Sequence, residues 1–104
     1  MYNKGLHAHW KHLMITYDEA KRLSNIEKHG FDFVGAEAIF RHFHITREDT
    51  RVEYGEPRFQ TLGLYGNVVV VMVVHTPRDH TDHIISIRKA ERHEQRLYWQ
   101  HYPD

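Results

Sequence analysis

Residues 68–75 read Val-Val-Val-Val-Met-Val-Val-His, and this segment is the strongest indication of the fold. β-branched side chains lose less freedom on a pleated sheet than in a helix, so the run predicts a strand. Its apolar residues do not alternate with polar ones, which indicates that both faces are covered and that the strand is central. The run is also too short to cross a bilayer as a helix.

The segments on either side of this run predict an antiparallel meander. Gly66-Asn67 is a two-residue turn typical of a hairpin, and residues 58–65 before it read as the partner strand. Residues 76–80 break the apolar pattern, and residues 83–87 resume it. We therefore expect three antiparallel strands with the valine strand in the middle.

The N-terminal part predicts a short strand and a helix. Residues 1–13 are expected to be a loosely ordered lead, and residues 14–17 a first strand. Asp18 is suited to cap a helix that runs to His29 and stops at Gly30. The helical period gives two expected faces, an inner one with Ala20, Leu23 and Ile26 and an outer one with Lys21, Asn25 and Lys28.

A second helix is expected after Asp32, which is suited to cap it, with an apolar inner face formed by Phe33, Ala36, Ile39 and Phe40. Residues 41–57 read as a loop with a marginal strand at residues 51–54. A C-terminal helix is expected near residues 89–99. Together these elements predict one α+β domain over residues 14–104, with N-terminal helices packed on an antiparallel sheet.

Composition limits the classes of function. The 104 residues contain no cysteine, which excludes disulfides, and 14 basic side chains balance 14 acidic ones. This balance argues against indiscriminate nucleic-acid binding but leaves room for a local basic site. With no leader or lipidation motif in view, we expect a cytoplasmic protein without a membrane segment.

The 11 histidines raise the question of a metal site. Three pairs have suitable spacing: His7/His9, His42/His44 and His80/His83. No cysteine and no His-Glu-x-x-His helix accompanies them, so the pattern favours solvated loop histidines over a metal site.

The C-terminal helix has a basic side. On a helical wheel Ala90, His93 and Leu97 gather on one side, and the other side collects Arg88, Lys89, Arg92, Arg96 and Trp99. Such a surface could hold a phosphate backbone and stack a base. A solvated helix surface explains the same pattern, and from the residues alone it is favoured.

The order of several motifs resembles the BrnT family of toxins over residues 14–99. The N-terminal half has Tyr17-Asp18, Lys21, Asn25, Lys28-His29-Gly30 and Phe33. The C-terminal half has Glu56-x-Arg58-Phe59, Gly63, His75-Thr76, Arg78, Ile84-Ile85-Ser86-x-Arg88-Lys89-Ala90, Glu94 and Tyr98. Ile87 departs from the family pattern, in which a small residue is common at that place.

The resemblance implies a RelE-like fold and a ribonuclease toxin of a type II toxin–antitoxin system that inhibits translation. It implies an RNA substrate and a BrnA-like antitoxin with a ribbon-helix-helix part, through which alone the toxin would reach operator DNA. No cofactor, metal or membrane is implied, and a homodimer is left open.

RNA cleavage by the neighbouring 2′-OH needs a base, an acid and cations at the phosphate, and no metal. Under the resemblance the expected catalytic residues are Arg58, His75, Arg88 and Tyr98, and the expected RNA-binding residues are Lys28, Lys89, Arg92 and Arg96. The two arginines suit phosphate, and His75 suits proton transfer. Lys89 and Tyr98 are candidates for orienting or protonating groups.

The hairpin should bring Arg58 close to His75, whereas Arg88 should end its strand nearer Val68. The Arg58–His75 pair is therefore better supported than the full set.

Each of these residues also has a structural interpretation. Arg58 can pair with Glu56 or Glu94, His75 can be a satisfied core histidine, and Tyr98 can pack on the sheet. Two other functions stay open. One is a non-catalytic module that binds antitoxin or nucleic acid in operon repression. The other is a histidine site that depends on a metal.

Overall fold

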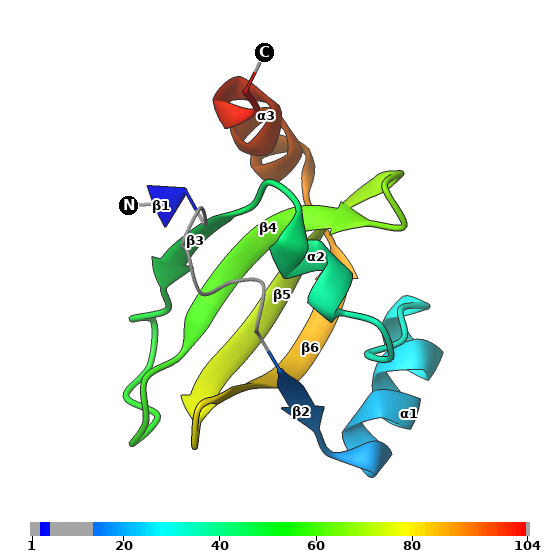
Figure 1. The fold of residues 1–104 in the computed structure, drawn as a ribbon, viewed down its shortest axis with the longest axis vertical. Helices are drawn as coiled ribbons and strands as arrows, with labels where there is room; N and C mark the ends of the chain where they lie inside the picture. The colour runs from blue at the N-terminus through cyan, green and yellow to red at the C-terminus, as the bar shows by residue number, and fades with distance from the viewer. Residues whose placement is uncertain (1–2, 5–13, 104) are drawn as a thin grey trace.

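The computed structural model describes residues 3–4 and 14–103 (Figure 1). Along these residues the elements are β1 (Asn3–Lys4), β2 (Ile15–Tyr17), α1 (Glu19–His29), α2 (Glu37–Arg41), β3 (Ile45–Glu48), β4 (Phe59–Tyr65), β5 (Val69–Arg78), β6 (Thr81–Lys89) and α3 (Arg92–His101). Apart from β1, the predicted lead of residues 1–13 lies outside the described part of the chain.

The strands form one sheet in the order β1-β3-β4-β5-β6-β2. The valine strand β5 lies inside it, between β4 and β6, so the predicted central meander is confirmed. All neighbouring strands are antiparallel except β2, which pairs with β6 in parallel. Helices α1 and α2 lie on one side of the sheet, and α3 lies at one end (Figure 1). The predicted α+β class is confirmed.

The hairpin turn between β4 and β5 forms at the predicted residues. Gly66 and Asn67 have φ angles of 62° and 58°, and the Val68 amide donates to the Tyr65 carbonyl over 3.2 Å. Two central residues with positive φ give a type I′ turn, whose twist suits paired strands. Val68 belongs to this turn and is 83% exposed, so the covered strand begins one residue later than predicted.

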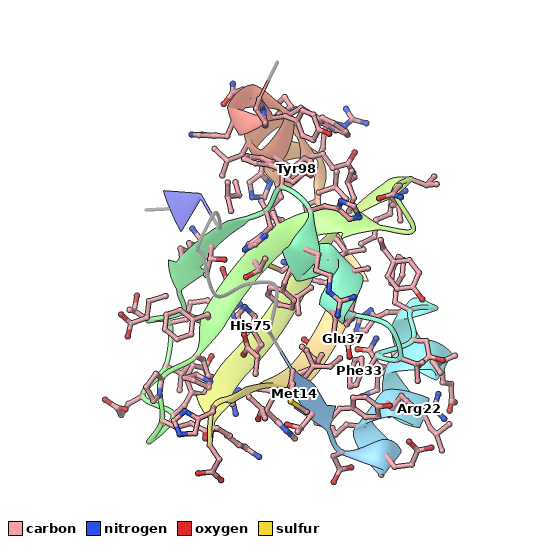
Figure 2. The ribbon with its side chains drawn as sticks, viewed as in Figure 1. Met14, Arg22, Phe33, Glu37, His75 and Tyr98 are labelled. Atoms are coloured by element: carbon pink, nitrogen blue, oxygen red, sulfur yellow. The ribbon has the colours of Figure 1, made fainter. Side chains whose placement is uncertain are left out.

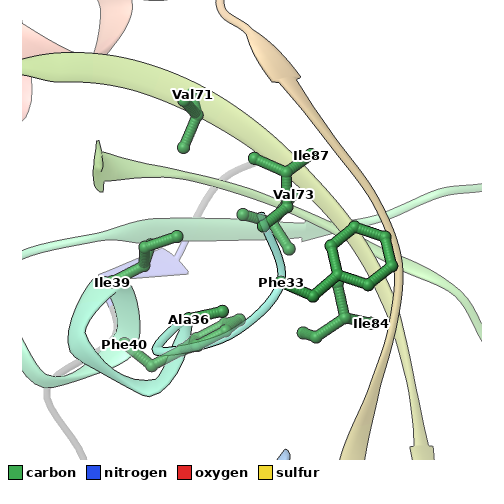
Figure 3. Close-up of a cluster of buried hydrophobic side chains, with 8 residues drawn as sticks. All are labelled: Phe33, Ala36, Ile39, Phe40, Val71, Val73, Ile84 and Ile87. Carbon is green, nitrogen blue, oxygen red and sulfur yellow. The ribbon is translucent and has the colours of Figure 1, made fainter. Parts of the chain in front are cut away.

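The face of the sheet toward α2 carries the first apolar cluster (Figure 3). Side chains from the α2 region pack against β5 and β6 in this cluster, which contains Phe33, Ala36, Ile39, Phe40, Val71, Val73, Ile84 and Ile87. All four residues predicted to face inward from the second helix are therefore buried. A register shift beside Val74 and His75 lets Ile84 and Ile87, three residues apart, point to the same side.

The predicted cap of the second helix is wrong. The Asp32 carboxylate accepts a hydrogen bond from the Val34 amide over 2.9 Å and so closes a turn before the helix. Helix α2 begins only at Glu37, with Ala36 at its N-cap position.

Helix α1 has the predicted ends, and Lys21 and Lys28 are exposed as predicted, but the predicted inner face is partly wrong. Asp18 caps it by accepting from the Lys21 amide over 3.0 Å, and Gly30 ends it with φ of 80°. The predicted inner residue Leu23 is 53% exposed, whereas the predicted outer residue Asn25 is buried. The Asn25 amide group bonds to the backbone of Ile87 in β6, so polar pairing replaces an apolar stripe here.

The other face of the sheet carries a second apolar cluster under α3. It contains Phe43, Ile45, Leu62, Val70, Met72, Ala90 and Tyr98. The predicted inner side of the last helix is partly wrong, because His93 is exposed while Glu94 and Tyr98 are buried. The helical wheel was drawn from Arg88, which belongs to strand β6, whereas α3 starts only at Arg92. The predicted faces therefore do not match those of the helix.

The predicted strand at residues 51–54 is also wrong, since the strand of this region is β3 at Ile45–Glu48. Residues 51–54 form a bent loop, in which the Arg51 and Tyr54 side chains both bond to Asp49. None of the helices within residues 14–103 is long and apolar enough to span a membrane.

Candidate active site

The register of the sheet places polar residues on the α3 side, in the part beyond the second apolar cluster. Leu62 and Met72, both in that cluster, stand opposite each other, and Arg88 continues their row in β6. The next row on this side joins Arg47, Gln60 and Val74. Because side chains alternate along a strand, the row after that begins with Arg58.

Four arginines gather around these rows, and we call Arg47, Arg51, Arg58 and Arg88 the arginine face. Arg47 Nε donates to Gln60 Oε1 over 2.9 Å, and with Arg51 these residues line a pocket of about 210 Å³. Arg51 is close enough to Arg88 for its charge to oppose the rise in the pKa of Arg88. Two of its charges are paired within the protein, Arg51 with Asp49 and Arg88 with Glu94.

Arg58 has an unusual environment within this face. Its guanidinium carbon lies 4.0 Å from the centre of the Tyr54 ring, which fixes its plane by a cation–π contact. Its Nε atom is buried and has no hydrogen-bond partner among the described residues. A buried donor without a partner is costly, so this guanidinium is held in place at the expense of one hydrogen bond.

A pocket of about 500 Å³ opens beside Arg58. Its walls come from the loop between β3 and β4, and they include Tyr54 and the carboxylates of Glu48, Asp49, Glu53 and Glu56. The pocket thus places proton acceptors near a fixed cation.

Asp49 holds the loop of this pocket in place. Arg51 donates two hydrogen bonds to its carboxylate, over 2.8 Å and 2.7 Å, and the Tyr54 hydroxyl donates a third over 3.3 Å. The Arg51 hydrogen bonds lower the pKa of Asp49 to about 2, against the effect of burial. Asp49 is therefore ionised at neutral pH and positions Tyr54, which in turn positions Arg58.

Arg88 forms an ion pair with Glu94 of α3. Its Nη1 and Nη2 atoms donate to the two Glu94 carboxylate oxygens over 2.8 Å and 3.0 Å. These hydrogen bonds raise the pKa of Arg88. Burial works to raise the pKa of Glu94, but the bonds from Arg88 and the Glu91 amide outweigh it and lower that pKa. The pair joins the last strand to the last helix.

His75 lies on the opposite face of the sheet. It is 4% exposed, with Nδ1 2.7 Å from Asp82 Oδ1 and Nε2 2.6 Å from Thr61 Oγ1. The rings of Phe40 and Phe59 enclose it, with centroids 5.0 Å and 6.0 Å away. Both ring nitrogens are therefore occupied inside the core, as expected of a satisfied core histidine.

Tyr98 is a residue of α3 and is fully buried between this helix and the sheet. Its hydroxyl donates to the Phe43 carbonyl over 3.0 Å, and burial raises its pKa to about 12. Tyr98 belongs to α3, and Figure 2 shows His75 far from it, over the sheet.

The structure does not bring the four predicted catalytic residues together. Phe59 stands opposite His75, so the predicted closeness of the two strand segments is confirmed. Arg58 nevertheless points to the other face, because it precedes Phe59 by one residue. Arg88 stands opposite Met72, on the Arg58 side.

The predicted RNA-binding residues are all exposed but do not form one surface. Lys28 ends α1, whereas Lys89, Arg92 and Arg96 lie at the end of β6 and along α3. Helices α1 and α3 lie at opposite ends of the molecule (Figure 1).

Sequence reasoning missed Arg47, Asp49, Arg51 and Tyr54. Alternation counted from Ile45 would have placed Arg47 on the α3 side, but the strand itself was predicted at the wrong residues. Nothing in the sequence marked the contact between Tyr54 and Arg58. Within residues 3–4 and 14–103, no three His, Asp or Glu side chains are arranged to hold a metal ion. His7 and His9 lie outside these residues.

Comparison with known proteins agrees with this fold. A family model described as ribonuclease toxin, BrnT, of type II toxin–antitoxin system matches residues 17–94. The 1.1 Å crystal structure of the Brucella abortus ribonuclease toxin BrnT is similar, with a TM-score of 0.57 and 25% sequence identity. The match covers 77% of this chain and 99% of the Brucella chain. No curated protein sequence matches the chain.

Proposed function

Because the chain belongs to the BrnT family of ribonuclease toxins of type II toxin–antitoxin systems, we propose that it cleaves RNA at the arginine face, without a metal ion, and so inhibits translation. The toxin unit in this proposal is residues 14–104, with the RelE-like fold that the family resemblance implies. It acts in the cytoplasm, where cellular RNA is found.

The environment of Arg58 carries the proposal. Its buried Nε has no partner among the described residues, and Tyr54 holds its guanidinium plane. Arg47 and Arg51 add charge on the same side of the sheet. Arg58 is partly exposed and lines the pocket, so a scissile phosphate bound there would meet a cation that is already oriented, which is the arrangement that stabilises developing charge most.

The cleavage step can be written with groups of this pocket. The 2′-oxygen attacks the neighbouring phosphorus and gives its proton to a carboxylate of the pocket. The bond from phosphorus to the 5′-oxygen breaks, and the carboxyl group returns that proton to the leaving oxygen, so a 2′,3′-cyclic phosphate and a 5′-hydroxyl are formed. Glu48, Glu53 and Glu56 line the pocket and are the proposed proton acceptors. Asp49 is a poor acceptor, because its pKa is about 2.

His75 and Tyr98 support this site from the core in our proposal. Neither side chain reaches the pocket beside Arg58. His75 faces α2, and Tyr98 is buried between α3 and the sheet. Arg88 orders the edge of the arginine face through Glu94.

The antitoxin partner follows from the family. We propose a BrnA-like protein whose acidic segment covers the arginine face and whose ribbon-helix-helix part carries the complex to operator DNA. Co-expression should relieve growth arrest, and Arg58→Ala should be harmless without the partner. A chain that arrests growth equally with and without such a partner would contradict the proposed pairing.

The test is cleavage of single-stranded RNA by purified protein, with and without EDTA. Arg58→Ala should slow cleavage by roughly 100- to 1000-fold, the cost of losing one donor to developing charge. Arg41→Ala, which removes an exposed arginine of α2, is the matched control and should cleave normally. Loss of cleavage in EDTA would contradict the metal-independent step. RNA binding by the parent without cleavage would favour the non-catalytic module.

A further inference from the structure

The outward side of α3 carries a surface that the cleavage site does not use. Arg92, Gln95, Arg96, Trp99 and Gln100 line a shallow depression there. These residues recur at helical spacing, so they form one continuous stripe. The buried residues Glu94 and Tyr98 face the sheet instead.

Trp99 is half exposed but firmly positioned. Its ring is 50% exposed and makes an edge contact with Tyr98, with centroids 5.0 Å apart and planes at 82°. Tyr102 contacts it from another direction at 5.2 Å. Because Tyr98 is itself buried and bonded to the Phe43 carbonyl, the indole stands on a rigid support.

The charge beside this indole is positive. Arg92 and Arg96 are both exposed and lie four residues apart, about one helical turn or 5.4 Å. Among the described residues no carboxylate pairs with either of them. The carboxylates close to them in the chain have other partners, since Glu91 caps the helix by accepting from the Glu94 amide and Glu94 is buried and bonded to Arg88.

We propose that this stripe of α3 is a subsite for single-stranded RNA, in which one base stacks on Trp99 and the phosphates that lead away from it toward the start of the helix bind Arg96 and Arg92. The inference rests on the proposed function and adds a contact outside the pocket beside Arg58. An acidic protein segment fits less well, because a stable protein interface needs a broad apolar centre. Here a single indole lies at one end of the stripe, about one helical turn beyond Arg96 and two beyond Arg92, which matches a stacked base followed by the phosphates of its strand.

A binding experiment tests this subsite without cleavage. The probe is a single-stranded oligonucleotide with 2′-O-methyl sugars, which cannot be cut. The chain has two tryptophans, so a Trp10→Phe background leaves Trp99 as the fluorescent reporter. We expect the probe to quench Trp99. Trp99→Ala removes this reporter, so its affinity is measured by the anisotropy of a fluorophore on the probe. Binding should be weaker by roughly 5- to 150-fold, the range for one stacked base.

Salt dependence separates stacking from charge. Each of Arg92→Ala and Arg96→Ala should lower the slope of log affinity against log salt by about 0.7, as for one phosphate contact on a single strand. Trp99→Ala should leave that slope unchanged. The control Arg41→Ala should change neither affinity nor slope.

Cleavage kinetics distinguish this subsite from the cleavage site. Trp99→Ala should raise KM for a long strand and keep kcat, whereas Arg58→Ala should lower kcat and still bind the probe. If Arg58→Ala cleaves normally while Trp99→Ala loses the probe, the proposed cleavage site fails and the subsite stands. Parental affinity in Trp99→Ala overturns the subsite. The subsite is also overturned if Trp99→Ala keeps the parental RNA affinity but forms a weaker complex with the antitoxin. The stripe would then be a protein interface.

Discussion

The two faces of the sheet treat their polar residues differently. On the α2 side a chain of contacts runs from Thr46 through Thr61 and His75 to Asp82, and it joins four strands inside the core. On the α3 side Arg58 keeps a buried donor without a partner among the described residues. A polar group that is satisfied within the protein stabilises the fold, whereas one left unsatisfied is available to a ligand.

Residues next to each other in the chain can therefore have unrelated roles. Phe59 packs beside His75 on the α2 side, while Arg58, one residue earlier, points toward the pocket on the other side. Under the proposed function, the α2 side stabilises the fold and the α3 side acts on the substrate, and four variants test this difference.

The largest loss of stability is expected for His75→Ala. Removing the ring leaves a cavity beside Phe40 and leaves the mostly buried Asp82 without its partner. We expect the free energy of unfolding to fall by about 3–5 kcal/mol, and cleavage per folded molecule to stay unchanged. Urea unfolding and cleavage on the same preparation measure both. Slow cleavage by a fully folded variant would bring His75 into the chemistry and break the comparison.

A smaller loss is expected for Asn25→Ala, which tests the polar attachment of α1 to β6. The change leaves the Ile87 amide and carbonyl without their side-chain partner in a buried place. The expected cost is about 1–3 kcal/mol in urea unfolding. Leu23→Ala is the control on the same helix, and as a change at an exposed position it should cost less than about 0.5 kcal/mol. The reverse order would mean that the apolar stripe predicted from the sequence holds the helix after all.

Tyr98→Phe sharpens the comparison on the α3 side. It removes only the hydroxyl that donates to the Phe43 carbonyl. The free energy of unfolding should fall by about 0.5–1.5 kcal/mol, while kcat for RNA cleavage stays at the parental value. A drop in kcat without a change in stability would mean that this hydroxyl takes part in proton transfer.

The smallest effect is the dependence of stability on pH from Asp49. Its pKa is about 2 in the folded protein, below the ordinary value of 3.8. Its contribution is therefore complete above about pH 4 and is lost as the pH falls through about 2. Asp49→Asn should be less stable than the parent at neutral pH, and the difference should shrink in acid. Because the Arg51 side chain is 63% exposed, salt should weaken the effect. A difference that is constant with pH would show that charge is not the cause.

The sequence predicted the parts of the fold that depend on local pattern. The valine run, the Gly66-Asn67 turn and the ends of α1 each rest on residues whose preference acts at their own position. The burial of Asn25 was not predicted, because a polar residue usually faces solvent and the Ile87 backbone groups that it bonds in β6 lie 62 residues away in the chain. Strand β3 was not predicted at its observed position, because its four residues mix apolar and charged side chains.

The candidate site was harder to predict than the fold. Family motifs pointed to Arg58 and His75, and the hairpin register brings their strand segments together. Which face each side chain takes depends on a one-residue offset, and the register shift beside His75 has no signal in the sequence. The contact between Tyr54 and Arg58 depends on the fold of a loop, which no periodicity describes.

The parallel pairing of β2 with β6 has a consequence for the order in which a newly made chain becomes a toxin. Thr16 lies opposite His83, so the first of these strands leaves the ribosome long before its partner has been synthesised. A chain interrupted before Thr81 has no strand to receive β2, no backbone for Asn25 to hold, and no Arg88. Under the proposed function, the cleavage surface is therefore completed only by the last quarter of the polypeptide, and we expect premature termination products to be inactive.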